Sequence, residues 1–123
     1  MVVILILKLN LISYSYWTQE LEEQSFKFNV ELDKDYSIST GKVLCIEEDQ
    51  VLEKDFTLFS FRILEINDNS IIIKTSCNMN SNKVTQLNKK DFTRFIIKKD
   101  KITELSYPNT KDMKCLCNFE LIY

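Results

Sequence analysis

The sequence contains no alanine and no histidine, and it has only one glycine, Gly41, and one proline, Pro108. Histidine is the most frequent general base in enzymes and the commonest metal ligand, so its absence removes the chemistry that depends on imidazole. The lack of alanine, together with many Ile, Thr, Phe and Tyr residues, moves the intrinsic preference from helix toward strand. These absences indicate an all-β protein.

Sequence motifs of known catalytic sites are also missing. There is no glycine-rich phosphate loop, no Gly-x-Ser-x-Gly elbow and no Cys–His couple. Carboxylates are plentiful, but nothing in the sequence selects a pair for acid–base work. The acidic run Glu47–Asp49, with Glu53 and Asp55, lacks the alternating pattern of a calcium loop, so we expect a solvated loop there. We therefore expect a protein that is not an enzyme, with no cofactor and no metal.

Length and composition suit one folded unit. The chain has 123 residues, 45% of them hydrophobic, which is enough for a single domain spanning 1–123 around one core. No repeat, proline-rich linker or low-complexity segment divides it. The abundance of Ile, Lys and Asn is typical of an AT-rich coding sequence. The many lysines are therefore weak support, by themselves, for a nucleic-acid partner.

Short alternating segments separated by Asn and Asp account for most of the chain. In SFKFNVEL the alternation places Phe26, Phe28, Val30 and Leu32 on one face, and a turn at 33–35 follows. The other strand candidates are YSISTGKVLCI, FTLFSFRILEI, SIIIKTS, DFTRFIIK, ITELSY and KCLCNFELIY. The pattern predicts a single-domain antiparallel β-sandwich or small β-barrel of about eight short strands, with little or no helix.

Several details of the strands can also be predicted. Gly41 interrupts its segment where a bulge or tight turn requires positive φ, and FTLFSFRILEI changes parity as a bulged strand does. The turn 67–69 predicts a hairpin to SIIIKTS, and 99–101 predicts a second hairpin between DFTRFIIK and ITELSY. CNMNSNK is expected to be a polar loop. The one helical candidate, TQELEEQ (18–24), is expected to form a turn at most.

The apolar N-terminus has two interpretations. The alternation from Leu5 to Leu11 predicts that 1–12 form the first strand. Alternatively, Ser13 and Ser15 imitate the cleavage site of a signal segment, although no basic residue precedes the apolar run. The run is far shorter than the roughly 20 residues of a membrane span, so none is expected. We favour the strand and a cytoplasmic protein, and export is the alternative.

The four cysteines also have alternative interpretations. In a final strand, Cys115 and Cys117 share a face with Phe119, which favours buried thiols that pack as small apolar groups. A metal site that also used Cys45 and Cys77 would lack the usual Cys-x-x-Cys pairs. In an exported protein, Cys77 could instead form a disulfide with the tail.

One segment of the chain is basic. Residues 89–101 contain six basic residues and two acids, whereas 18–55 contain eleven acids and four lysines. The candidate binding residues of the basic segment are Lys89, Lys90, Arg94, Lys98 and Lys99. With Phe92 and Phe95 interleaved, they could bind a single-stranded nucleic acid through phosphate contacts and base stacking. Because the whole chain has a net charge of −2, we favour a solvated edge hairpin and consider nucleic acid unfavoured.

A second candidate surface is the aromatic cluster of Tyr14, Tyr16 and Trp17, which would be a binding hot spot if exposed, although we favour burial.

Together these features predict a non-catalytic binding or structural module that contacts a protein partner through exposed sheet edges and charge-segregated faces. The alternatives are a nucleic-acid-binding barrel that uses 89–101 and an exported envelope domain with a disulfide. The partner and the oligomeric state are not specified by the sequence.

Overall fold

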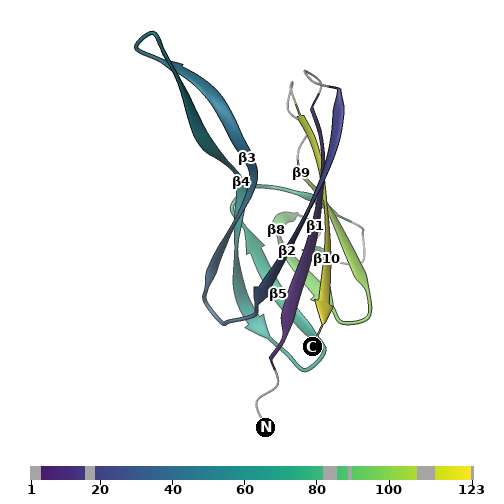
Figure 1. Cartoon of the computed structure of the whole chain (residues 1–123). Helices are drawn as coiled ribbons and strands as arrows, with labels where there is room; N and C mark the ends of the chain where they lie inside the picture. The colour runs from purple at the N-terminus through teal and green to yellow at the C-terminus, as the bar shows by residue number, and fades with distance from the viewer. Residues whose placement is uncertain (1–3, 16–18, 82–85, 89, 108–112, 123) are drawn as a thin grey trace.

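The alternating segments form two five-stranded antiparallel sheets that pack face to face (Figure 1). The computed structural model describes residues 4–15, 19–81, 86–88, 90–107 and 113–122, without the side chains of 15, 40–47, 52–56, 86, 113 and 114. We call the two sheets A and B. In spatial order, sheet A consists of β2 (Glu20–Asn29), β1 (Ile6–Ser15), β10 (Met113–Ile122), β9 (Ile102–Tyr107) and β6 (Asn80–Ser81). Sheet B consists of β3 (Asp35–Glu47), β4 (Gln50–Ile66), β5 (Ser70–Thr75), β8 (Asp91–Lys98) and β7 (Gln86–Asn88).

This architecture confirms the predicted all-β sandwich. No helix occurs among the described residues, and the two sheets do not close into a barrel there. The described strands number ten instead of about eight, because β6 and β7 are short strands with weak alternation. None of the described segments is a helix long and apolar enough to cross a membrane.

The core lies between the inner faces of the two sheets. Alternation buries Leu7, Leu9 and Leu11 of β1, which confirms that the N-terminal segment contains a strand. Phe61 of sheet B lies at the centre, with its ring centroid 5.7 Å from that of Phe28 and 5.8 Å from that of Phe119, both in sheet A. Both contacts are edge-to-face, a geometry that adds about 0.5–1.5 kcal/mol beyond area burial.

The predicted irregularities of sheet B are confirmed. The β3–β4 register shifts between Ser39 and Lys42, where Gly41 lies, and the β4–β5 register shifts between Ile63 and Glu65. Beyond the first shift, β3 and β4 continue as a two-stranded hairpin that projects away from the sandwich (Figure 1). We call residues 42–55 the β-arm.

Two predictions about local structure are wrong. Five of the seven residues of TQELEEQ belong to β2, because Glu20–Gln24 pair along β1 from Ser15 to Leu11, and this pairing overrides local preference. DFTRFIIK and ITELSY do not form a hairpin, since β8 pairs with β5 and β9 pairs with β10. The segment 99–101 therefore carries the chain from sheet B to sheet A.

Two smaller corrections concern the ends of strands. Leu32 was expected on the face of Phe26 and Phe28, but β2 ends at Asn29 and Leu32 is 57% exposed. The expected polar loop CNMNSNK contains the buried Met79 and the strand β6, which pairs with β9.

Candidate functional site: a basic strip on sheet B

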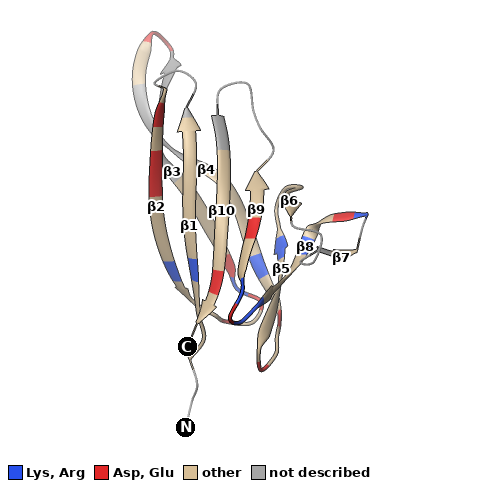
Figure 2. Ribbon diagram, turned by 90° about the vertical axis from the view of Figure 1, so that its right-hand side faces the viewer, with Lys and Arg blue, Asp and Glu red and all other residues tan. Residues whose placement is uncertain are grey.

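The outer face of sheet B brings together basic residues from three strands. The register places Lys74 of β5 opposite Arg62 of β4 on one side and opposite Arg94 of β8 on the other. Alternation adds Lys98 of β8 to the same face, and Lys90 lies in the turn just before β8; both are exposed. We call Arg62, Lys74, Lys90, Arg94 and Lys98 the basic strip; Figure 2 shows basic residues on β5 and β8.

Two of the central cations have acidic partners. Arg62 Nε and Nη2 donate to the two carboxylate oxygens of Asp35 at 2.8 Å each, a bidentate pair that lowers the pKa of Asp35 below its usual value. Arg94 lies 3.8 Å from Asp91, whose carboxylate also accepts two hydrogen bonds from Thr93. These Thr93 bonds are the main reason that the pKa of Asp91 is lowered.

Lys74 has no such compensation. Among the described residues its ammonium makes no ion pair or hydrogen bond, although both of its cross-strand neighbours are cations. Like charges directly opposite one another destabilise a sheet by a few tenths to about 1 kcal/mol. The strip therefore concentrates positive charge that the described part of the chain does not neutralise.

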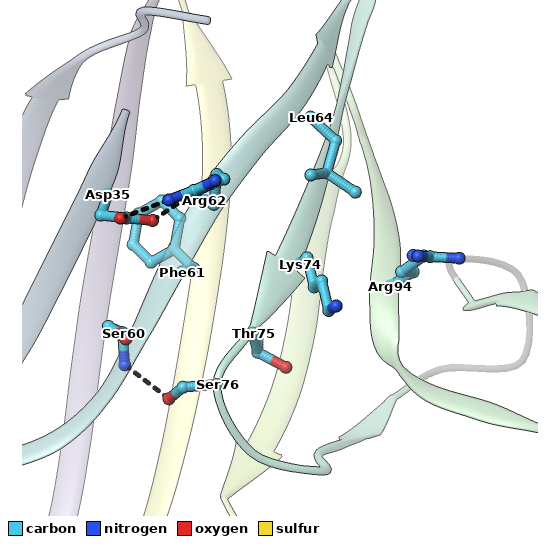
Figure 3. A pocket seen from close by; sticks show the side chains of 9 residues that line it. All are labelled: Asp35, Ser60, Phe61, Arg62, Leu64, Lys74, Thr75, Ser76 and Arg94. Atoms are coloured by element: carbon cyan, nitrogen blue, oxygen red, sulfur yellow. Dashed lines mark hydrogen bonds and ion pairs between the residues drawn. The ribbon is translucent and has the colours of Figure 1, made fainter. Parts of the chain in front are cut away.

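A shallow depression of about 330 Å³ surrounds Lys74. Its wall contains the charged row of Asp35, Arg62, Lys74 and Arg94, together with Leu64 and a group of hydroxyl residues, Ser60, Thr75 and Ser76 (Figure 3). Ser76 Oγ accepts a hydrogen bond from the Ser60 amide at 2.9 Å. The depression is large enough for a few side chains of a partner, and three cationic side chains line it.

The structure divides the basic residues predicted from sequence. Arg94 and Lys98 share the outer face of β8 with Phe92, which is 43% exposed, and Lys90 lies in the turn just before this strand. Lys99 is half-buried at the crossing to sheet A, where its backbone forms a bridge with Leu121, and Lys89 lies outside the described residues. The expected edge hairpin is not formed, because β8 lies inside sheet B between β5 and β7.

Sequence reasoning missed Arg62 and Lys74. They lie far from 89–101 along the chain and become its neighbours only through the β4–β5 and β5–β8 registers. The available signal was parity: SIIIKTS places Lys74 on the face opposite its buried isoleucines, and the same parity holds for Arg94.

The aromatic candidates are only partly described. Tyr14 is half-buried on β1, opposite Leu21 of β2 and Lys114 of β10. Tyr16 and Trp17 lie outside the described residues, so the aromatic cluster stays a prediction.

The predicted burial of the tail cysteines is confirmed. Cys115 and Cys117 are 2% and 0% exposed and, like the half-buried Cys77, are free thiols. Burial raises the pKa of Cys115 to about 11 and that of Cys117 to about 12. Among the described residues no three potential metal ligands come together. Cys45 pairs with Leu52 through the backbone of the β-arm, and its side chain is not described.

The solvated loop expected for the acidic residues is wrong for three of them: Glu48 and Asp49 form the turn of the β-arm, whereas Glu47 ends β3 and Glu53 and Asp55 lie in β4. Glu48 and Asp49 are exposed and have φ angles of 48° and 65°, as in the tight turns that match strand twist. Glu48 and Asp49 thus lie at the end of a hairpin that extends beyond the two-layer sandwich (Figure 1).

The free edge of sheet A at β2 carries mostly acidic residues. β2, at one end of sheet A, carries Glu20, Glu22, Glu23 and Lys27, and charges on an edge strand oppose pairing with another chain.

No protein-family model, curated protein or solved structure matches this chain.

Proposed function

We propose that this chain is a non-catalytic binding module that holds an acidic segment of a protein partner on the basic strip of sheet B. The observation that carries this proposal is Lys74, an exposed ammonium between two cations and without an acidic partner in the described structure. A partner carboxylate at this point would remove like-charge repulsion that the sheet otherwise bears.

The form of the strip favours an acidic protein over a nucleic acid. Its five cations are accompanied by three acids, Asp35, Glu65 and Asp91, so the net charge is 5 − 3, or +2. Phe92 is the one exposed aromatic among the side chains described on this face, whereas grooves for single strands stack several bases on aromatics. The small excess of charge suits a few carboxylates better than a phosphate backbone.

The strip is also a better candidate than the β2 edge. Edge pairing requires a free backbone ladder, and the charges of β2 oppose the approach of another strand. The strip instead uses side chains that already point to solvent, so binding requires no rearrangement of the sheet.

Binding of a labelled oligoglutamate peptide, followed by fluorescence anisotropy at about 0.15 M salt, tests the proposal. We expect the double variant Lys74→Glu/Arg94→Glu to bind at least about tenfold more weakly than the native chain. The matched control is Lys8→Glu/Lys27→Glu, which reverses two lysines on the outer face of sheet A. It should retain binding within about twofold.

Equal losses in the two variants would show that only net charge matters and would refute the strip as a site. A single-stranded oligonucleotide of equal charge serves as competitor. If the oligonucleotide binds more tightly than the peptide, and this binding is lost in the strip variant, the nucleic-acid alternative replaces this proposal.

A further inference from the structure

The β-arm is the acidic counterpart of the basic strip. Residues 42–55 contain five acids, Glu47, Glu48, Asp49, Glu53 and Asp55, against Lys42 and Lys54, a net charge of −3. Its turn residues are exposed, and Val51 beside the turn is 66% exposed. Two exposed acidic residues therefore lie at the tip of a segment that leaves the sandwich (Figure 1).

The arm cannot reach the basic strip of its own chain. From Gln50 at the turn to Arg62 in the strip, β4 runs twelve residues as one continuous strand, which spans roughly 40 Å at about 3.3 Å per residue. The turn and the strip also belong to the same sheet, so the turn cannot fold over the strip without breaking the β3–β4 pairing. Contact between these two charged regions requires two molecules.

We infer that the acidic partner of the basic strip is the β-arm of a second copy of this chain. The inference rests on the proposed function and identifies its partner. In this contact the carboxylates of Glu48 and Asp49, adjacent at the turn, approach Lys74 and Arg94, which face each other across the β5–β8 register. Cross-strand neighbours have Cβ atoms about 5 Å apart, a spacing that two successive turn residues can match.

The shape and charge of the two surfaces support this pairing. A two-residue turn is a narrow tip, and the depression around Lys74 has a volume of about 330 Å³. The arm carries −3 and the strip +2, so attraction steers the tip of one molecule toward the strip of another.

The contact is heterologous, because different surfaces of the two copies meet. Such contacts build chains of copies, or rings where the rotation closes, and each copy at an open end keeps one free arm or one free strip. This predicts a specific pattern in mixtures of variants, which a symmetric dimer would not give.

Sedimentation velocity at low salt, over a range of protein concentrations, tests the inference. The native chain should self-associate, and both the arm variant Glu48→Lys/Asp49→Lys and the strip variant Lys74→Glu/Arg94→Glu should weaken association by about tenfold or more. An equimolar mixture of the two variants should regain association in 1:1 stoichiometry, because the intact strip of one meets the intact arm of the other, and the reversed arm and reversed strip are complementary in charge as well. All four positions are exposed, and unchanged circular dichroism and thermal unfolding will show that the variants fold.

The outcomes separate the inference from the proposed function. If the strip binds oligoglutamate but the native chain stays monomeric, the inference is wrong and the proposed function stands. If neither binding nor association occurs, both are wrong. Association that survives in the arm variant, or a mixture that forms no complex, also overturns the inference, and the variant Glu104→Lys/Glu120→Lys on sheet A controls for net charge.

Discussion

The two sheets are alike on their inner faces and different on their outer faces. Inside, both are apolar, with mainly Leu and Phe from sheet A and mainly Ile and Phe from sheet B, and Phe61 of sheet B meets Phe119 of sheet A at 5.8 Å. Outside, Lys8 of sheet A has Lys27 on one neighbouring strand and Glu120 on the other. Lys74 of sheet B has a cation on each side.

The apolar inner faces account for folding, whereas the charge arrangement of the outer faces needs a separate explanation. A sandwich requires only that both inner faces be apolar and complementary, and both sheets meet this requirement. The outer faces are free to vary, so an arrangement that costs stability there needs another explanation. For sheet B, the explanation that we propose is binding.

The largest expected effect is the loss of folding stability when an aromatic ring is removed from the inner face of either sheet. Phe61→Ala and Phe119→Ala should each lower the free energy of unfolding by about 3–5 kcal/mol, because each leaves a cavity in the core. Since the two rings are in contact, the double variant should lose less than the sum. Denaturant unfolding measures these values. Phe92→Ala on the outer face is the control, with a loss below about 1 kcal/mol, and equal losses at all three sites would contradict the assignment of the core.

A smaller effect is expected at the cysteine on the inner face of sheet A. Cys117→Ser places a hydroxyl among apolar neighbours and should cost about 1–3 kcal/mol in denaturant unfolding. Cys77→Ser, at a half-buried position, should cost less. Native Cys115 and Cys117 should also resist labelling by a bulky thiol reagent, and rapid labelling of both would show that this end of the core is open.

The same thiols predict a dependence on alkaline pH. Because burial raises the pKa values of both thiols in the native state, the stability that they contribute is fully present below pH 9, where the native and the unfolded chain both carry neutral thiols. Above pH 9 the unfolded thiols ionise first, so the free energy of unfolding falls until the native pKa values of about 11 and about 12 are passed. Subtracting the pH profile of Cys115→Ala/Cys117→Ala isolates this contribution. A difference that stays constant from pH 8 to 12 would refute it.

The smallest expected effect is the change in folding stability when a lysine is removed from an outer face, and it should differ between the two sheets. Lys74→Thr removes repulsion from two neighbouring cations and should stabilise the fold by about 0.2–1 kcal/mol at low salt. Lys8→Thr should change stability very little, because the lost attraction to Glu120 offsets the relief from Lys27. Thermal unfolding at two salt concentrations compares the variants. Destabilisation by Lys74→Thr would mean that Lys74 has a structural role.

Much of the fold could be predicted from the sequence, because alternation reports directly which side of a strand is buried. The pattern around Leu7–Leu11 and Cys115–Phe119 identified two central strands of sheet A correctly. Strand partners were harder. DFTRFIIK and ITELSY are joined by a good turn sequence, but β8 pairs with β5 in sheet B and β9 pairs with β10 in sheet A.

The candidate site could be predicted only in part for the same reason. Lys90, Arg94 and Lys98 are close in sequence and share one parity, so their clustering was visible. Arg62 and Lys74 join them through two registers, one of which shifts at the bulge after Ile63. A shift of one residue moves every later side chain to the other face, so no local pattern specifies this arrangement.

The central claim is that residues from β4, β5 and β8 form one binding surface. Amide chemical shifts of the ¹⁵N-labelled native chain, recorded during titration with oligoglutamate, test it most directly. We predict that the largest changes fall together at Arg62, Lys74 and Arg94, three positions that only the outer face of sheet B unites. Changes centred on Lys8 and Lys27, or spread evenly over all lysines, would contradict the claim.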